Sequence, residues 1–364
     1  MGAITSSGWE ELRLEIACAA ASDDLRALRE KMQELFSSEQ SSKPAAELYH
    51  HLNIVHDMLI SRTVKMAERR LVAEGGGEPP LPYAFILVGS AGRSEQTPWS
   101  DQDNGLVYAD PAPGMEDSAA LYYSKLASLI RQGLELAGYP PCRGKVLADQ
   151  ALWRHSLTGW KRLLDGWFAE PVWENVRYLL IASDMRAISG NPQLADDIKL
   201  HFNNRIQHNP ELLLPLMANT LHHKVPLGLL GRIVTERYGE AAGGVDIKYG
   251  LYIPLVNAVR LLALESGIAE SATLMRIEEL VKKKVLPDEF GAICRDVFEK
   301  AMEFRLATPF THKNGHFNAN GVMPAEKLTK ACRLELRRDF RFVRQLQKKV
   351  VQRVRISAYP PNKP

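Results

Sequence analysis

The sequence lacks the features that mark secreted, membrane and nucleic-acid-binding proteins. No C-x-x-C pair occurs, and the cysteines lie far apart, which argues against disulfides and a zinc site and for free thiols in a reducing cytoplasm. No apolar run approaches the roughly 20 residues of a membrane helix, and the start lacks a signal-peptide pattern. The net charge of +3 is nearly balanced, so it gives no reason to expect a nucleic acid or membrane partner. The four cysteines are Cys18, Cys142, Cys294 and Cys332.

What the sequence does have is the composition of a globular protein, with 45% hydrophobic and 24% charged residues. Its 364 residues suggest two or three domains. The glycine- and proline-rich stretch at Ala73–Pro82 is the clearest break. We predict an N-terminal helical segment over 1–75, a small α+β domain with a mixed sheet over 76–150, and a helical domain over 151–364.

The 76–150 region is the only part with strand-like patterns. Tyr83–Gly89 and Asn104–Ala109 are short, apolar runs that suit buried strands. A short helix can begin near Ser90, and a longer helix is expected over Glu116–Gly138, ended by glycine. Gly144–Ala148 is a weaker candidate for a third strand.

Helical patterns dominate the rest of the chain. Before the break, Leu48, Leu52, Val55, Leu59 and Met66 form one apolar stripe, and Ser37–Pro44 separates two helices. Beyond Trp153 we expect helices only, among them Asp246–Gly267 and a basic helix from about Pro324 to Val354. The basic residues of that last helix are interpreted as a solvated face rather than a nucleic-acid site, because no aromatic residues alternate with them to stack bases.

The residues between the two predicted strands point to phosphate and metal chemistry. Asp101 and Asp103 alternate, so an extended backbone would project both carboxylates to one side, where a divalent cation would relieve their repulsion. Such hard oxygen ligands suit Mg²⁺ or Mn²⁺ bound together with substrate phosphates. The Gly89-Ser90 turn could hold a phosphate on its backbone N–H groups, and Arg93 could add a planar fork. A solvent-facing loop remains the simpler interpretation of a lone D-x-D pair.

The stretch GSAGRSEQTPWSDQDN resembles the signature of the nucleotidyltransferase superfamily that includes DNA polymerase β. It is most similar to bacterial nucleotidyltransferases that resemble the nitrogen-regulatory protein uridylyltransferases. The matching residues are Gly89, Ser90, Gly92, Arg93, Glu95, Gln96, Ser100, Asp101, Gln102, Asp103 and Asn104. Further similarity covers Gly138–Trp160, Ser183–Ile198 and Asp246–Ile268, the last resembling the family's helical substrate-binding domain.

The resemblance implies a role for each matched residue. Gly89 and Ser90 would hold the β- and γ-phosphates of an NTP, while Asp101 and Asp103 would bind Mg²⁺ or Mn²⁺ and act as catalytic residues. Arg93, Glu95, Gln96 and Asn104 would belong to the nucleotide site. The superfamily usually adds a third catalytic carboxylate on a later strand. The candidate for it here is Asp149, which could equally cap a helix; Asp184 is expected to pair with Arg186 or to cap locally.

Two functions from different classes follow. The first is a metal-dependent enzyme that moves a nucleoside monophosphate from an NTP to a hydroxyl of a protein or small molecule, with a regulatory role. The second is a catalytically silent module that binds a nucleotide and signals to a partner, which the doubtful third carboxylate favours. Cys142, near Arg143 and Lys145, could be a reactive thiol or a small residue packed in a tight turn.

Overall fold

The computed structural model describes residues 8–228, 231–239, 241–313 and 316–360. Helix makes up 63% of it, and one small mixed sheet lies in the N-terminal half, which confirms the predicted fold class. The chain divides into two compact units. The first unit comprises Met1–Leu163, Asp184–Lys199 and His312–Phe317, and the second comprises Leu164–Ser183, Leu200–Thr311 and Asn318–Pro364. No helix among the described residues is long and apolar enough to cross a membrane.

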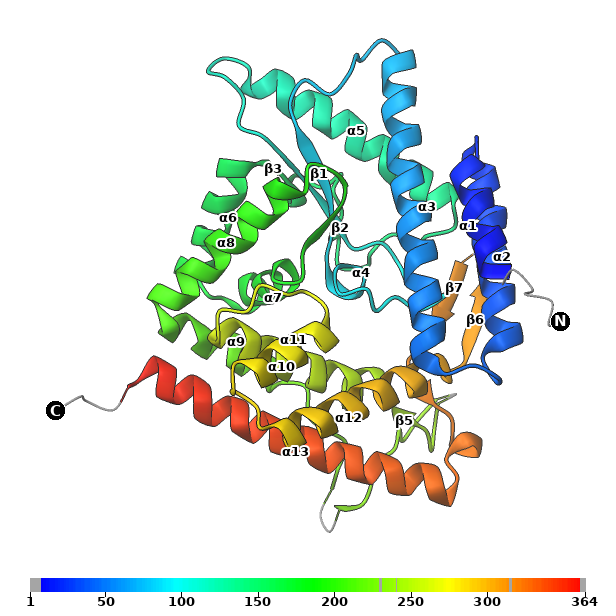
Figure 1. The fold of residues 1–364 in the computed structure, drawn as a ribbon, viewed down its shortest axis with the longest axis vertical. Helices are drawn as coiled ribbons and strands as arrows, with labels where there is room; N and C mark the ends of the chain where they lie inside the picture. The colour runs from blue at the N-terminus through cyan, green and yellow to red at the C-terminus, as the bar shows by residue number, and fades with distance from the viewer. Residues whose placement is uncertain (1–7, 229–230, 240, 314–315, 361–364) are drawn as a thin grey trace. The chain divides into compact units, whose positions relative to one another are not determined.

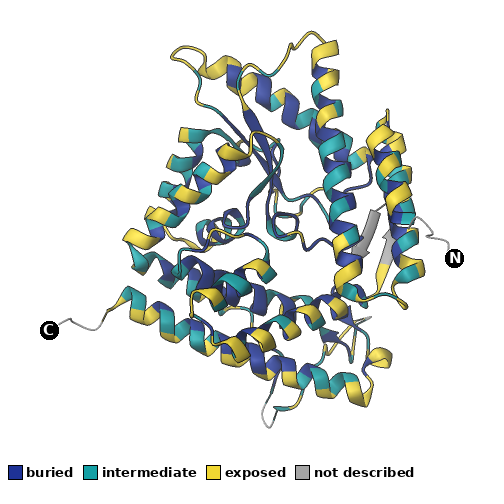
Figure 2. Ribbon diagram, in the orientation of Figure 1, coloured by how far each residue is buried: buried dark blue, intermediate teal, exposed yellow. Residues whose placement is uncertain are grey.

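A four-stranded sheet forms the centre of the first unit (Figure 1). Its order is β3-β2-β1-β4, with β1 antiparallel to β2 and β4 and β2 parallel to β3. Every residue of β1 and β2 is buried, as their apolar sequences require (Figure 2). The strands are β1 (Tyr83–Leu87), β2 (Asn104–Tyr108), β3 (Arg154–Ser156) and β4 (Arg186–Gly190).

The register of β1 and β2 determines what meets at the end of the sheet. Tyr83 pairs with Tyr108 and Leu87 pairs with Asn104, so the end of β1 lies beside the start of β2. The pairing extends one step further, because the Val88 N–H donates to the Asp103 carbonyl at 3.1 Å. Residues that follow β1 and residues that precede β2 are therefore brought together.

The helices of the first unit surround this sheet. In α3 the predicted stripe is buried, as are the apolar residues of α1 and α2 that pack on it. The sequence did not predict a break between α1 and α2, where the Asp24 carboxylate accepts from the backbone N–H groups of Ala20 and Ala21. The helices are α1 (Gly8–Cys18), α2 (Ser22–Glu39), α3 (Ala45–Ala73), α4 (Gly89–Gly92) and α5 (Glu116–Leu136).

Two sequence predictions about strands were wrong. Gly144–Ala148 is irregular rather than a strand, since its backbone meets β2 at one residue only: the Asn104 N–H donates to the Val146 carbonyl. The other two strands of the sheet, β3 and β4, lie beyond Trp153, where the sequence predicted helices only. Both are short edge strands of half-buried residues, so neither leaves the apolar run that reveals a buried strand.

The second unit is mainly helical. Helix α10 (Ile253–Glu265) is buried on all sides and begins after a π-helical turn at Lys248–Tyr252. It packs against α9 (Leu213–Thr220), α11 (Thr273–Lys282) and α13 (Lys330–Ala358). The apolar stripe of the last helix is buried as predicted, although that helix begins later, after its cap at Thr329. Two short strands, β5 (Val245–Asp246) and β8 (Val322–Met323), pair with each other.

The remaining elements complete the chain. Helices α6 (Leu157–Ala169) and α8 (Pro192–His208) each contain residues of both units. The second unit also contains α7 (Trp173–Ala182), α9 (Leu213–Thr220), α10 (Ile253–Glu265), α11 (Thr273–Lys282), α12 (Asp288–Leu306) and α13 (Lys330–Ala358), and strands β6 (Phe310–Lys313) and β7 (His316–Ala319) pair with each other.

Candidate functional site

A glycine turn and a carboxylate meet at the end of β1. Gly89 has a φ of +59°, a conformation that L side chains rarely adopt. A Cβ on Gly89 would stand 2.9 Å from Oδ2 of Asp103, so only a residue without a side chain leaves room for this carboxylate. The turn and the Asp103 side chain are thus in close contact. Helix α4 begins at Gly89, the second residue after β1 (Figure 1).

The matched motif divides into a partly exposed group and a buried frame. Gly89, Ser90, Asp101 and Asp103 are partly exposed, while the residues between and around them are mostly buried. Asp101 and Asp103 lie just before β2 rather than within it. Both are partly exposed while Gln102 between them is buried, which is the alternation expected of an extended chain. The residue types that could contact an NTP and a metal are therefore the ones that solvent reaches.

Arg93 belongs to the buried frame. Its Nε lies 2.7 Å from Glu95 Oε2, and its Nη1 lies 2.6 Å from Asp184 Oδ2. Asp184 follows α7 in a turn and pairs with Arg93; the expected partner, Arg186, instead binds Asp57 at 2.6 Å. Close packing places Asp184 beside Arg93. The Asp184 backbone lies so near Gly92 that a Cβ on Gly92 would stand 2.1 Å from the Asp184 carbonyl oxygen.

Gln96 is held through its backbone and Asn104 through its side chain. The Gln96 N–H donates to Asn53 Oδ1 at 2.8 Å, and Asn104 Oδ1 accepts from the Ala148 N–H at 2.8 Å. Between them, the Gln102 side chain donates to the Tyr139 carbonyl at 3.0 Å. These hydrogen bonds hold the loop before β2 against α3 and against the segment that follows α5.

The Cys142 thiol lies beside the aspartates. Burial, followed by the charge of Asp103 and a hydrogen bond with its side chain, raises the pKa of Cys142 to about 12. A neutral thiol is the form that donates a hydrogen bond to a carboxylate, so Cys142 is a protonated neighbour of Asp103 rather than an activated nucleophile.

Asp149, the candidate third carboxylate, has a close partner of its own. Its Oδ2 lies 2.8 Å from Nε of Arg131 on α5, and its Oδ1 accepts from the Gln150 amide at 3.1 Å. Asp149 follows the irregular Val146–Ala148 segment and is not on a strand. Both carboxylate oxygens are therefore engaged by neighbouring side chains.

Sequence reasoning missed the contribution of the N-terminal helices to the loop of residues 96–103, which we call the aspartate loop. Arg29 and Gln33 of α2 and Asn53 and His56 of α3 all bind its backbone. All four side chains are buried. A polar residue within an apolar helical stripe was the available signal, but the sequence alone does not show what such a residue contacts.

His56 forms a fixed bridge in this support. Its Nε2 lies 3.1 Å from the Thr97 carbonyl and its Nδ1 lies 2.7 Å from the Tyr139 hydroxyl. Burial, with the nearby charge of Arg29, lowers the pKa of His56 to about 3, so the ring is neutral near pH 7. Because a carbonyl only accepts, the proton is assigned to Nε2, and Nδ1 accepts from the Tyr139 hydroxyl.

The residues present fit a divalent cation that is shared with substrate phosphates. Among the residues that the structure describes, no group of three or more His, Cys, Asp and Glu side chains could enclose a metal. Two carboxylates beside a glycine turn instead suit Mg²⁺ or Mn²⁺, which commonly binds one or two carboxylates and completes its shell with phosphates and water. Gly89 and Ser90 are partly exposed, so phosphates in solution can reach the turn.

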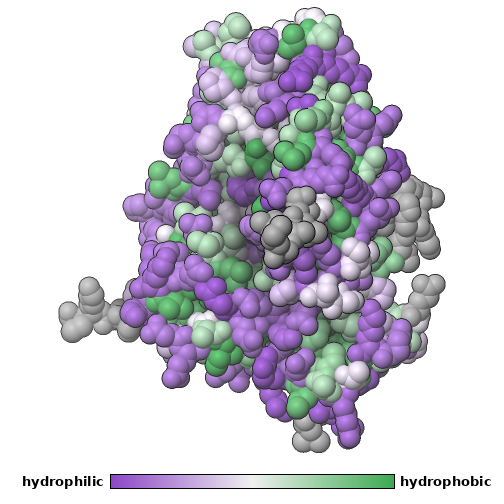
Figure 3. Space-filling model, turned by 45° about the vertical axis from the view of Figure 1, so that its right-hand side comes forward, coloured by the Kyte–Doolittle hydropathy of each residue, from purple (hydrophilic) through white to green (hydrophobic). Residues whose placement is uncertain are grey.

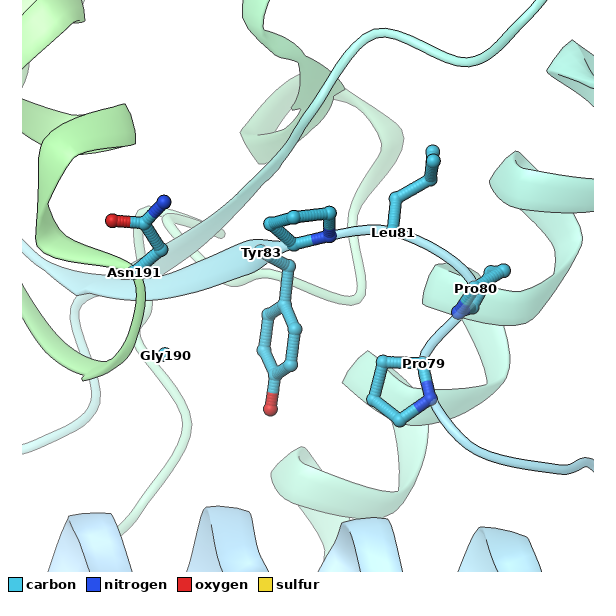
Figure 4. A pocket seen from close by; sticks show the side chains of 7 residues that line it. Pro79, Pro80, Leu81, Tyr83, Gly190 and Asn191 are labelled. Carbon is cyan, nitrogen blue, oxygen red and sulfur yellow. The ribbon is translucent and has the colours of Figure 1, made fainter.

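A surface pocket occurs at the opposite end of β1. It is lined by the Pro79–Tyr83 run together with Gly190 and Asn191, and Figure 4 shows Pro79 and Pro80 on one side of Tyr83 and Asn191 on the other. Tyr83, which lines the pocket, lies six residues before Gly89, about 20 Å away along an extended chain. On the face seen in Figure 3, described hydrophobic and hydrophilic residues are interspersed rather than gathered into one apolar patch. The motif, rather than this pocket, therefore defines the candidate site.

Two protein-family models match the chain. The family model named "Putative nucleotidyltransferase DUF294" matches residues 26–174, which include the whole motif. A second model, "Putative nucleotidyltransferase substrate binding domain", matches residues 210–354. No curated protein matches the chain.

Proposed function

Since the chain belongs to the DUF294 nucleotidyltransferase family, we propose that it moves a nucleoside monophosphate from an NTP to a hydroxyl group of a protein or small molecule. The acceptor oxygen forms a bond to the α-phosphorus, the bond to the β-phosphate oxygen breaks, and pyrophosphate leaves. The hydroxyl proton passes to water. We place this activity in the cytoplasm, because the four cysteines, all among the described residues, are free thiols.

The observation that carries the proposal is the contact between Gly89 and Asp103. A positive φ and the absence of a Cβ are both needed for the turn to lie against the carboxylate. The turn offers backbone N–H groups to phosphates, while Asp103 and its neighbour Asp101 offer oxygens to Mg²⁺ or Mn²⁺. A bound cation would neutralise the phosphate charge and orient the triphosphate.

The remaining motif residues support this arrangement indirectly. Arg93 and Glu95 fix α4 through the buried cluster with Asp184, while Gln96 and Asn104 fix the two ends of the aspartate-bearing segment. We propose that the second unit binds the acceptor, because the substrate-binding family model matches residues within it.

One observation favours the silent nucleotide-binding module. Asp149 is bound by Arg131 and Gln150, so it is not an obvious base for the attacking hydroxyl. A site with only two working carboxylates could bind NTP and a cation without transferring the nucleotide. The two functions differ in turnover rather than in binding.

Turnover with labelled NTPs distinguishes them. Purified protein is incubated with each α-labelled NTP, Mg²⁺ or Mn²⁺ and cell extract, and both labelled acceptor and pyrophosphate are measured. Asp101→Asn and Asp103→Asn should abolish both products. Asp117→Asn, which changes an exposed carboxylate in the first turn of α5, should retain them. NTP binding without product would support the silent module, and the absence of both binding and product would contradict both functions.

A further inference from the structure

The aspartate loop, residues 96–103, is held from outside the sheet by a buried arginine. Arg29 lies on α2, is 2% exposed, and directs its guanidinium at backbone carbonyls. Its Nη2 donates to the Ser100 carbonyl at 3.1 Å and to the Pro98 carbonyl at 3.4 Å, and its Nη1 donates to the Gly138 carbonyl. These contacts join the residues directly before Asp101 to the end of α5.

This arrangement is costly for a purely structural role. A buried cation without an ion pair loses its hydration, and backbone carbonyls offset only part of that loss. Burial lowers the pKa of Arg29, whereas the charge of Asp101 acts to raise it, and the Tyr139 ring lies 4.0 Å from the guanidinium carbon. Arg29 thus interacts with the charge of Asp101 and also binds the backbone of the residue before it.

The neighbours of Arg29 support the same loop. Gln33, one turn further along α2, donates to the Pro98 carbonyl at 2.9 Å. The Thr97 N–H donates to Ser100 Oγ at 2.9 Å, which closes the loop on itself. A shift of α2 would therefore move the backbone that carries Asp101.

We infer that Arg29 is a positioning residue that holds the aspartate loop so that Asp101 and Asp103 face the Gly89-Ser90 turn. This inference rests on the proposed function and assigns a part of the site to α2, outside the sheet and its loops. Arg29 acts through backbone geometry and touches neither phosphate nor metal.

The test compares two arginines that both bind backbone carbonyls from helices of the same unit. Arg29→Gln removes the contacts to the aspartate loop. Arg62→Gln, the matched control, removes donors from α3 to the Ala19 carbonyl and leaves the loop untouched. Gln33→Ala is a milder variant in case Arg29→Gln does not fold. Hydrogen exchange of the 96–103 amides is measured without ligand, and Mn²⁺ affinity is measured with a non-hydrolysable NTP.

Arg29→Gln should speed exchange in residues 96–103 and weaken Mn²⁺ binding by about 10–100-fold, the usual effect of removing a partner behind a metal ligand. Gln33→Ala should act in the same direction with a smaller effect, and Arg62→Gln should change neither. Unchanged exchange in folded Arg29→Gln, or equal changes in Arg62→Gln, would overturn the inference. Faster exchange in Arg29→Gln, combined with no Mn²⁺ binding by the native protein, would contradict the proposed function instead.

Discussion

The carboxylate of Asp103 lies against the backbone of Gly89, with Oδ2 only 2.9 Å from the place that a Cβ would occupy. This contact joins the second residue after β1 to the residue before β2, two positions that the antiparallel register brings together. A turn suited to phosphate and an oxygen ligand suited to a cation thereby share one surface.

Replacing the glycine should separate these two groups. Gly89→Ala should weaken Mn²⁺-NTP binding, because the new methyl group displaces the Asp103 carboxylate. It should also lower the free energy of unfolding by about 1–2 kcal/mol, since the residue must keep a positive φ. Isothermal titration and urea unfolding measure the two effects.

Gly166→Ala is the control for this substitution. Gly166 lies in α6 with an ordinary φ and open space where the methyl group would stand, so alanine should keep binding and stabilise the helix by about 0.5–1 kcal/mol. Equal binding by both alanine variants would show that the Gly89 contact does not shape the site.

The guanidinium of Arg93 should act mainly on stability. Arg93→Gln removes the guanidinium that pairs with the buried carboxylates of Glu95 and Asp184, which should lower the free energy of unfolding by about 3–5 kcal/mol. Arg177→Gln breaks an exposed pair with Glu174 and should cost less than about 1 kcal/mol. Urea unfolding of both variants provides the comparison, and similar losses would argue against a structural role for Arg93.

His56 should make stability fall as the pH is lowered. Its native pKa of about 3 lies below the ordinary value of 6.5, so between these pH values the unfolded chain binds a proton that the native protein does not. The His56 contribution is complete above about pH 6.5 and should shrink by about 2 kcal/mol at pH 5.

His56→Gln should therefore lose less stability than the native protein between about pH 7.5 and pH 5, as measured by urea unfolding. His208→Gln, at an exposed histidine in α8, serves as the control. Identical pH dependence in the native protein and His56→Gln would show that His56 titrates normally.

The Cys142 thiol should react slowly with iodoacetamide. A pKa of about 12 leaves a thiolate fraction near pH 8 of about 10⁻⁴, far below that of an ordinary thiol. Peptide mapping after brief labelling should find exposed Cys18 modified well before Cys142. Labelling of Cys142 first would contradict the hydrogen bond to Asp103.

The sequence predicted the elements whose patterns are strong. Two largely apolar runs indicated β1 and β2, and the apolar stripe of α3 indicated its buried face, because burial selects residue types directly. The sequence did not predict β3 or β4, whose residues are half-buried and so carry no clear alternation.

The exposed residues of the candidate site could be predicted from the sequence, whereas the buried residues that support them could not. Glycine and alternating aspartates carry their chemistry in their residue types, so the exposed group could be found. The supporting residues Arg29 and His56 could not be found, since they lie far from the motif in the chain and only folding brings them to it. The partner of Asp184 was missed for the same reason: Arg93 is distant in sequence, whereas Arg186 is close by.

Mn²⁺ binding in the presence of a non-hydrolysable NTP tests the central claim most directly. Electron paramagnetic resonance titration should show tight binding to the native protein and to Asp117→Asn. Asp101→Asn and Asp103→Asn should each weaken it by more than about tenfold, because each removes an oxygen ligand. Native-like Mn²⁺ affinity in both aspartate variants would contradict the account.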